Sequence, residues 1–357
     1  MIEGLVKEIF EVSRKLEDLK LMSFCGTHEH TIASSGIREI IPRSIELIPG
    51  PGCPVCITPA GIIDEAIRLS LEGIEILTFG DAYRLPGFKW TKGGFPRSLM
   101  EAKELGGKVK VVYSPAEALH EGSGERVFLA IGFETTVPAT VSLLERGKDR
   151  VKIISAHRLT PPVMVHTLEK HGKGKISGII APGHVSAIIG AKAWEFLPRD
   201  YGIPTVVSGF EPEDVLISIL GLLRMIEAGR PELLNTYSRV VRAEGNKKAL
   251  SSMEKWFEVR DASWRGLGMI PKSGLFLKEK WRNYDAEFQY GLRFEDSSEK
   301  NLPGCRCVEV VLGMSTPLEC PLFMKSCTPE RPYGPCMVSL EGTCYIWARN
   351  YGKRRRG

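Results

Sequence analysis

The chain has 357 residues, of which 43% are hydrophobic and 25% are charged, and its formal net charge is +5. This length suggests two or three domains with large buried cores, and the composition is ordinary for a soluble globular protein. Four positive charges lie in the terminal run KRRR at 353–356. We interpret that run as a solvated tail, because no motif for nucleic-acid binding accompanies it.

Neither a membrane span nor a secretion signal is expected. The first ten residues, MIEGLVKEIF, include Glu3 and lack an uninterrupted apolar core. The longest apolar stretch, VLISILGLLRMI, is too short to span a bilayer. We therefore expect a cytoplasmic protein. Nine cysteines in such a reducing compartment indicate metal binding or redox chemistry rather than structural disulfides.

Short apolar runs that end at Gly or Pro turns succeed one another along the first 235 residues. They are LKLMSFCG, SIELIPGPG, IEILTFGD, KVKVVYSP, RVFLAIGFE, VKIISAHR, KISGIIAPGH and PTVVSGFEP. Runs without clean alternation fit strands buried on both faces. Helix-compatible stretches such as AGIIDEAIRLSLEG separate several of them. This alternation predicts an α/β fold with parallel sheets.

These eight runs fall into two sets of four. SFCGTHEHT corresponds in place to AIGFETTVP, and LTFGDAYRLPG corresponds to IIAPGHVSAIIG. The correspondence predicts two similar parallel-sheet α/β domains, at residues 1–120 and 121–235. From about residue 240 the chain becomes rich in charged and aromatic residues, and then in Cys, Pro and Gly. Residues 236–357 are therefore expected to form a smaller C-terminal domain that lacks a large core.

Polar motifs follow the apolar runs directly. CGTHEHT places Cys25 and His28 after the first run, FGD places Asp81 after the third, GFETT places Glu134 after the fifth, and PGHVS places His184 after the seventh. The carboxyl ends of parallel strands are where sites gather, so these groups converge on one cleft if the two halves face each other. A structural role is the alternative for two of them, because His184 could begin a helix and Glu134 could cap one.

Cys53 and Cys56 form a C-x-x-C pair in the turn after the second run. The spacing allows a disulfide or a shared metal, and it can lower the pKa of one thiol. Structural zinc needs four ligands, which Cys25 and His28 could complete, but we favour a redox dithiol. Cys25 could instead be a small buried hydrophobe. Because it is a thiol beside two imidazoles, we expect Cys25 with His28 to bind iron or another transition metal.

The other six cysteines are crowded near the C-terminus, and they are the strongest functional signal. They are Cys305, Cys307, Cys320, Cys327, Cys336 and Cys344. None of their spacings is C-x-x-C, which argues against a zinc ribbon, and the absence of C-x-x-x-C-x-x-C disfavours a radical SAM enzyme. Four thiolates from this set could hold a [4Fe–4S] cluster. The alternative is six unligated thiols, which such crowding disfavours.

Six motifs, in order over nearly the whole chain, resemble those of the hydrogenase maturation factor HypD family. They are CGTHEHT, PGPGCPVC, TFGDAYRLPG, GFETT, PGHVSAIIG and ECPLFMKSCTPERPYGPCMVSLEGTC. The resemblance implies a [4Fe–4S] domain after two α/β domains. It also implies a redox scaffold, rather than a conventional turnover enzyme, that assembles the Fe(CN)2CO group of [NiFe] hydrogenases. The implied partners are a HypC-like small chaperone and a HypE-like cyanide donor.

The same resemblance assigns roles to individual residues. It implies that Cys25 is an iron ligand and that Cys53 and Cys56 are the redox dithiol. Supporting polar groups would be Glu134, His184 and Glu341. Cys320, Cys327 and Cys344 are the favoured cluster ligands. The usual C-x-C-G appears here as CRCV at 305–308, without the glycine, so the ligand within that pair stays open.

An alternative function is a thiol–disulfide oxidoreductase that resembles ferredoxin:thioredoxin reductase. In that reading a [4Fe–4S] cluster reduces the disulfide of a protein substrate. The alternative shares the cluster and the dithiol with the maturation scaffold, but it needs no iron at Cys25.

Overall fold

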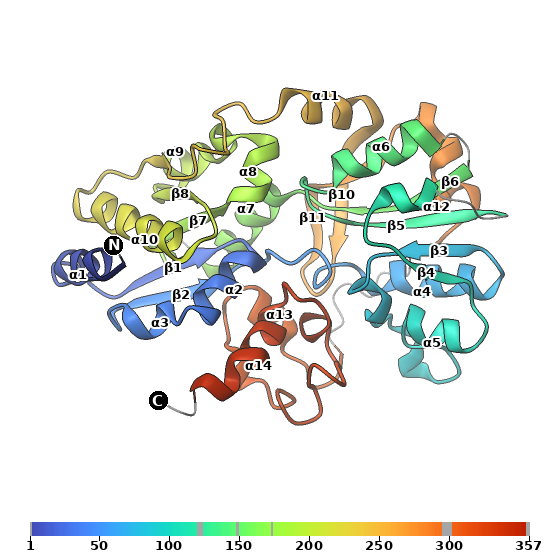
Figure 1. Cartoon of the computed structure of the whole chain (residues 1–357), viewed down its shortest axis with the longest axis horizontal. Coiled ribbons are helices and arrows are strands. Elements are labelled where there is room, and N and C mark those ends of the chain that lie inside the picture. Colours follow the sequence, from blue (N-terminus) through green and yellow to red (C-terminus); the bar gives the residue numbers. More distant parts are fainter. Residues whose placement is uncertain (1, 120–123, 148–149, 173, 295–301, 355–357) are drawn as a thin grey trace.

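The computed structural model describes residues 2–119, 124–147, 150–172, 174–294 and 302–354. Two α/β lobes lie side by side, and a smaller segment that ends in α14 packs against them (Figure 1). The last residues of the basic tail, 355–357, lie outside the described residues. Within the described part, none of the helices is both long enough and apolar enough to cross a membrane.

A five-stranded parallel sheet with strand order β2-β1-β7-β8-β9 forms the centre of lobe one. Its strands are β1 (Leu19–Ser23), β2 (Ile45–Pro49), β7 (Gly178–Pro182), β8 (Thr205–Ser208) and β9 (Leu233–Asn235). Its helices are α1 (Ile2–Ser13), α2 (Gly26–Ser34), α3 (Ile37–Ile40), α8 (Gly183–Ile189), α9 (Phe196–Tyr201) and α10 (Pro212–Glu227). The apolar sides of α1 and α10 pack together on the sheet and bury Ile9 and Leu216.

A four-stranded parallel sheet with strand order β4-β3-β5-β6 forms the centre of lobe two. Its strands are β3 (Glu75–Thr78), β4 (Val109–Val111), β5 (Arg126–Gly132) and β6 (Val151–His157). The helices are α4 (Ala60–Leu71), α5 (Leu99–Glu104) and α6 (Val137–Gly147), whereas α7 (Thr160–His171) follows β6 and lies beside β7 and α8 of lobe one (Figure 1). Every residue of β5 is buried. This agrees with the continuous apolar run seen in the sequence, because a central parallel strand is covered on both faces.

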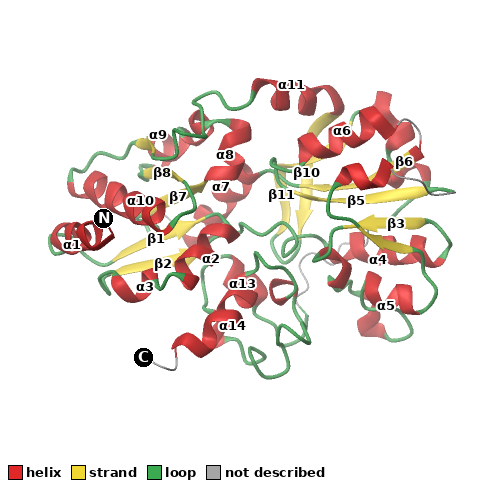
Figure 2. Ribbon diagram, viewed as in Figure 1, coloured by secondary structure: helices red, strands yellow, loops and turns green. Residues whose placement is uncertain are grey.

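The rest of the chain adds a hairpin and a segment with little regular structure. The hairpin consists of β10 (Phe257–Trp264) and β11 (Gly268–Leu277), with α11 (Lys247–Trp256) before it and α12 (Ala286–Gln289) after it. The final helices are α13 (Cys307–Val311) and α14 (Thr343–Arg354). Short 3₁₀ turns occur at Ala82–Arg84, Lys89–Lys92, Pro115–Leu119, Ala191–Trp194, Glu279–Tyr284, Pro317–Glu319 and Pro335–Met337. Figure 2 shows that loops make up most of the segment around α13 and α14.

The predicted α/β fold with parallel sheets is confirmed, but the strands do not pair as the boundary at residue 120 required. β1 and β2 pair with β7–β9, whereas β3 and β4 pair with β5 and β6. Lobe two, from α4 to β6 at 60–157, is therefore inserted between two parts of lobe one. The start of the third domain at 236 also differs, because Ser155 Oγ donates to Leu275 O at 2.6 Å and ties the hairpin to lobe two.

The two sets of four runs are nevertheless visible in the topology. Read from the outer strand inward, lobe one has the order β2-β1-β7-β8, and lobe two has the order β6-β5-β3-β4. Strands at the same place in the two orders are four strands apart in the chain. They are β2 and β6, β1 and β5, β7 and β3, and β8 and β4. The runs predicted to correspond, β1 with β5 and β3 with β7, hold equivalent positions. The repeat is real, but each copy contributes two strands to each sheet.

Candidate functional site

Cys25 lies two residues beyond β1, where it forms the N-cap of α2 with extended backbone (φ −150°, ψ 126°). The glycines around it permit close approach of other loops. A Cβ at Gly52 would lie 2.5 Å from the Cys25 nitrogen, and a Cβ at Gly26 would lie 2.6 Å from Cβ of Glu341. The thiol is therefore surrounded by the β2–α4 loop on one side and the C-terminal segment on the other.

The Cys25 thiol is held in its protonated form at neutral pH. Burial raises its pKa to about 11, and the nearby charge of Glu341 acts in the same direction. The backbone N–H groups of His28 and Thr27, at the start of α2, act in the opposite direction and favour the thiolate. A metal that binds Cys25 must therefore displace a proton, after which the helix terminus stabilises the sulfur charge.

His28 uses both ring nitrogens within the protein. Nε2 lies 2.9 Å from the carbonyl oxygen of Gly209, so Nε2 carries the proton, and Nδ1 accepts from Ser23 Oγ at 3.2 Å. Burial lowers the pKa of His28 to about 4. A neutral imidazole with both positions engaged has no lone pair for a metal. The predicted metal role of His28 is therefore not available in this arrangement, and the ring instead fixes α2 against the loop after β8.

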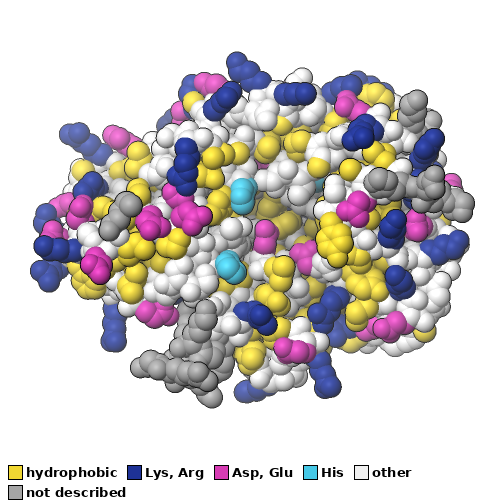
Figure 3. Space-filling view, viewed as in Figure 1, with side chains coloured by type: hydrophobic (Ala, Val, Ile, Leu, Met, Phe, Trp, Pro, Cys, Tyr) yellow, Lys and Arg dark blue, Asp and Glu magenta, His cyan; other side chains and the backbone are white. Residues whose placement is uncertain are grey.

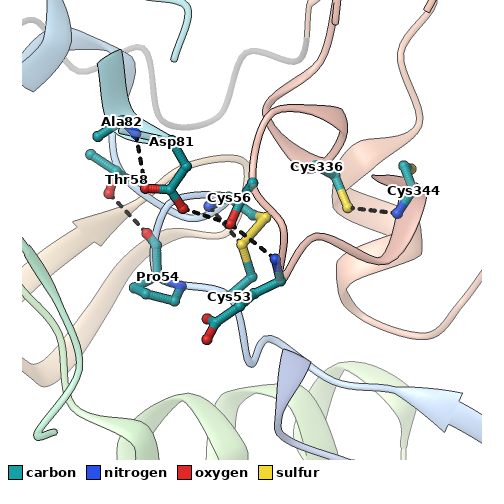
Figure 4. The surroundings of a disulfide bond; sticks show 10 residues. Cys53, Pro54, Cys56, Thr58, Asp81, Ala82, Cys336 and Cys344 are labelled. Carbon is teal, nitrogen blue, oxygen red and sulfur yellow. Dashed lines mark hydrogen bonds between the residues drawn. A yellow bond between two sulfur atoms is a disulfide. The ribbon is translucent and has the colours of Figure 1, made fainter. Parts of the chain in front are cut away.

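Cys53 and Cys56 are joined by a disulfide in the loop between β2 and α4. Both residues are buried, and Thr58 Oγ1 donates to Pro54 O at 2.9 Å to close the turn. In Figure 4 the disulfide lies between Asp81 and the loop that carries Cys336. Asp81 Oδ2 accepts from Ser339 Oγ at 2.9 Å. The disulfide is thus enclosed by lobe two and the C-terminal segment together.

The C-terminal thiols gather into one group. The Cys305 and Cys307 sulfurs are 3.1 Å apart, and the Cys344 N–H donates to the Cys336 sulfur at 3.2 Å. Hydrogen bonds from the Cys307 and Cys344 thiols lower the pKa of Cys336. The charges of Cys305 and Cys307 also act on Cys327. Of the six cysteines, these five therefore lie near one another.

The group fits a polynuclear iron–sulfur centre by its donors. Among the described residues no three His, Cys, Asp or Glu side chains stand in an arrangement that could hold a single metal ion. Cysteine thiolates are nevertheless the donors that iron–sulfur clusters use, and five of the six C-terminal cysteines lie near one another here. A Cβ at Gly334 would lie 2.6 Å from both the Cys305 and Cys307 sulfurs, so only glycine leaves room beside them.

Two small cavities connect these thiols to Cys25. One is lined by Cys25, Cys53, Cys56 and Cys336, and the other is lined by Cys56, Cys305 and Cys307. The disulfide lies between Cys25 and the C-terminal thiols and borders both cavities. We call this arrangement of Cys25, the Cys53–Cys56 disulfide and the C-terminal thiols the thiol row.

Comparison with known proteins identifies the family to which this arrangement belongs. The HypD family model, described as "Hydrogenase formation hypA family", matches residues 1–351. The chain belongs to the HypD family. A putative hydrogenase expression/formation protein of Methanocaldococcus jannaschii is 41% identical over 355 residues, which cover 97% of this chain and 96% of that protein.

Relatives from two bacteria agree with this assignment. The hydrogenase maturation factor HypD2 of Bradyrhizobium diazoefficiens is 41% identical over 371 residues, with coverage of 99% of this chain and 94% of that protein. The hydrogenase maturation factor HypD of Cupriavidus necator is 40% identical over 338 residues, with coverage of 90% and 87%. The site therefore belongs to a hydrogenase maturation factor of the HypD family.

The remaining HypD-like motifs do not converge on the thiol row as expected. Glu134 follows β5 in lobe two and caps the start of α7. Its carboxylate accepts from Thr160 N and Oγ1, both at 2.8 Å. It lines a separate groove of about 570 Å³, and burial raises its pKa to about 7. His184 is exposed and stacks on Phe210, with ring centres 3.9 Å apart. Phe210 also contacts His28, so His184 lies near the CGTHEHT motif of lobe one but outside the thiol row.

Glu341 has the supporting position that the HypD resemblance implied. It packs on Gly26 and lines the cavity of Cys25, and burial together with the charge of Asp81 raises its pKa to about 7. On one face of the molecule, histidine and acidic side chains are visible where the two lobes meet (Figure 3). Among the described residues, the chemistry of the row is therefore mainly thiol and carboxyl.

Two further results concern the predicted cluster ligands and a residue that sequence reasoning missed. The role of Cys320 as a cluster ligand stays a prediction, and the thiol contacts among the described residues join Cys305, Cys307, Cys336 and Cys344. Arg265 was missed altogether, although it lines the cavity of Cys56 and Cys305. Its only signal in the sequence is its place in the glycine-containing turn RGLG.

Proposed function

We propose that this HypD family member is the scaffold on which the Fe(CN)2CO group of [NiFe] hydrogenases is assembled, and that it takes part in inserting the cyanide ligands. The observation that carries the proposal is the thiol row, in which the disulfide borders one cavity with Cys25 and another with Cys305 and Cys307. Such a row would set a site for cargo iron, a redox dithiol and an electron-transfer centre next to one another.

Cys25 would hold the iron atom, which is the substrate of assembly. Low-spin iron with cyanide and carbonyl ligands favours soft thiolate donors. Cys25 supplies one, and a cysteine of a HypC-like small chaperone would supply another. Binding releases the Cys25 proton, and the N-terminus of α2 stabilises the resulting thiolate. The partly exposed position of Cys25 leaves the thiol open to a partner.

The resident cofactor would be a [4Fe–4S] cluster held by four of the C-terminal thiols. On their contacts, Cys307, Cys336 and Cys344 are the favoured ligands, with Cys305 or Cys327 as the fourth. When bound, such a cluster supplies one-electron chemistry. Gly334 leaves the space beside the Cys305–Cys307 pair, and the Asp81–Ser339 hydrogen bond holds the loop of Cys336 against lobe two.

The Cys53–Cys56 pair would store two electrons as thiols and release them on return to the disulfide. The pair shares a cavity with Cys25. Its two electrons would therefore be available at the place where a HypE-like donor delivers cyanide. A thiol–disulfide oxidoreductase would use the same pair and the same thiols, but it would leave Cys25 without a metal. Iron at Cys25 is the point that separates the two functions.

Anaerobic purification of the chain with its HypC-like partner tests this proposal. We expect brown protein with about four irons per chain beyond the cargo iron, and infrared bands of bound CN and CO. Brown protein that reduces its disulfide but shows no such bands, with or without the partner, would favour the oxidoreductase. Colourless protein with one tightly held zinc would contradict both functions.

A further inference from the structure

Arg265 connects the β10–β11 turn to the middle of the thiol row. Its backbone N–H donates to Ile57 O at 2.8 Å, one residue beyond Cys56. On its side chain, Nη2 donates to the carbonyl oxygen of Pro86. The other terminal nitrogen, Nη1, is buried and has no hydrogen-bond partner within the described residues. A buried, charged donor without a partner is costly and marks a place where a negative group belongs.

The space next to Arg265 is lined by thiols. Arg265 shares its small cavity with Cys56, Cys305 and Cys307, and its charge interacts with both Cys307 and Cys305. Burial lowers the pKa of Arg265 to about 10, so the guanidinium remains charged at neutral pH. The charge of Asp64 also acts on Arg265, and this buried carboxylate accepts from the backbone N–H groups of Phe88 and Lys89.

We propose that Arg265 is the charge-compensating residue of the C-terminal metal centre, and that it sets the reduction potential of that centre. The inference rests on the proposed function, because it presupposes an iron–sulfur cluster on these thiols. A cluster with four thiolate ligands is anionic, and each electron that it accepts adds one negative charge. Net charge, hydrogen bonds to sulfur and burial are the factors by which a protein tunes such a potential.

Burial is what makes Arg265 effective, and Arg306 shows the contrast. Arg306 lies between Cys305 and Cys307 in the sequence, but its side chain is about a third exposed (36%) and is paired with Glu309. Solvent and its carboxylate partner therefore screen that charge. The chain thus offers two arginines beside the same pair of cysteines, one whose buried Nη1 has no partner among the described residues and one whose charge is screened.

The test compares reduction midpoints of the full-length holoprotein, measured by EPR during titration with dithionite, a one-electron reductant. In Arg265→Gln we expect electron binding to weaken at least about tenfold, which lowers the midpoint by about 59 mV. Arg265→Lys keeps the charge and should retain most of the wild-type value. Arg306→Gln is the matched control. Its equilibrium constant for electron binding should stay within about twofold of the wild-type value.

A second variant gives an effect of opposite sign. Asp64→Asn removes the carboxylate that opposes Arg265, so we expect its midpoint to rise by a comparable factor. This variant decides the matter if Arg265→Gln does not fold or does not retain iron. The inference is overturned if Arg265→Gln shifts no more than Arg306→Gln, or if Asp64→Asn leaves the midpoint unchanged or lowers it. A wild-type protein without any cluster would instead contradict the proposed function itself.

Discussion

Cys25 and Glu134 hold equivalent positions in two similar sheets, yet their surroundings have opposite characters. Each residue lies two positions beyond an inner strand, β1 or β5. Cys25 borders a cavity that it shares with a disulfide, whereas both carboxyl oxygens of Glu134 are bonded to Thr160. The repeat therefore preserves the strand order but not the chemistry at the strand ends.

The difference comes from what packs on each sheet. On lobe one, the C-terminal segment packs beside α2, where Trp347 Nε1 donates to Glu29 Oε1 at 2.6 Å. On lobe two, the β10–β11 hairpin covers the equivalent region, and Trp264 stacks on Phe133. A cysteine of the C-terminal segment lines the cavity of Cys25, whereas the groove of Glu134 is lined by other residues. We conclude that the segments after β9 make the two lobes differ. They complete a candidate site at the strand end of Cys25 and cover the strand end of Glu134.

The largest expected effect separates these two residues directly. In the complex with the HypC-like partner, Cys25→Ala should abolish the CN and CO infrared bands, because the iron loses its thiolate, while the brown colour remains. Glu134→Gln should keep the bands, because a glutamine can still accept from Thr160 N and donate to Thr160 Oγ1. Full-intensity bands in Cys25→Ala would mean that iron is held elsewhere.

The comparison extends to the neighbouring strands, β2 and β6. The loop after β2 carries the disulfide, whereas the loop after β6 carries Arg158, which donates to Ser263 O at 2.9 Å. Reduction should expose two additional titratable thiols in the wild type and in Arg158→Lys, but none in Cys53→Ala. A count by mass spectrometry after alkylation checks this. An unchanged gain of two thiols in Cys53→Ala would remove the dithiol from the proposed function.

A smaller effect concerns stability and pH. The pKa of Glu134 is raised from 4.5 to about 7 in the folded protein, so between these values only the unfolded state releases the proton. The free energy of unfolding therefore falls as pH rises from about 4.5 to 7 and is level above that. Glu134→Gln should remove this fall, which is about 3 kcal/mol, as measured by urea unfolding at several pH values. Parallel pH curves for the two proteins would contradict the burial argument.

The smallest expected effect is on the reactivity of Cys25. Glu341→Gln removes a negative charge that raises the Cys25 pKa, so alkylation of Cys25 at pH 8.5 should accelerate about two- to fivefold. Peptide mass spectrometry follows that single thiol. Glu46→Gln, at an exposed pair with Lys20 in the same lobe, is the control and should leave the rate unchanged. Equal rates in all three proteins would show that Glu341 does not act on Cys25.

Local patterns in the sequence predicted the elements and the repeat, because buried parallel strands leave continuous apolar runs such as that of β5. They could not predict which strands pair, since that depends on where the chain crosses between lobes after β2 and β6. The pairing also decides which site residues meet. Cys25 and Cys53 meet because β1 and β2 are neighbours, whereas Glu134 is carried to the other lobe with β5.

Other parts of the site depended on contacts that no motif records. His28 looked like a ligand, but the carbonyl of Gly209, far along the chain, occupies its Nε2. The position of Cys320 relative to the other five C-terminal cysteines could not be predicted. Loops rich in Pro and Gly have no periodicity that indicates which way a side chain points. Arg265 had no motif at all, since its significance arises from a cavity lined by five separate segments.

The insertion of lobe two within lobe one has a consequence for the order of events during synthesis. The sheet of lobe two is contiguous and is complete once residue 157 has emerged. β1 and β2 emerge first, yet β7, β8 and β9, which complete their sheet, follow only between Gly178 and Asn235. Because domains form as the ribosome releases them, the inserted lobe closes before the enclosing one. Cys25 is thus among the earliest residues made, but its surroundings are finished last, when Glu341 reaches Gly26.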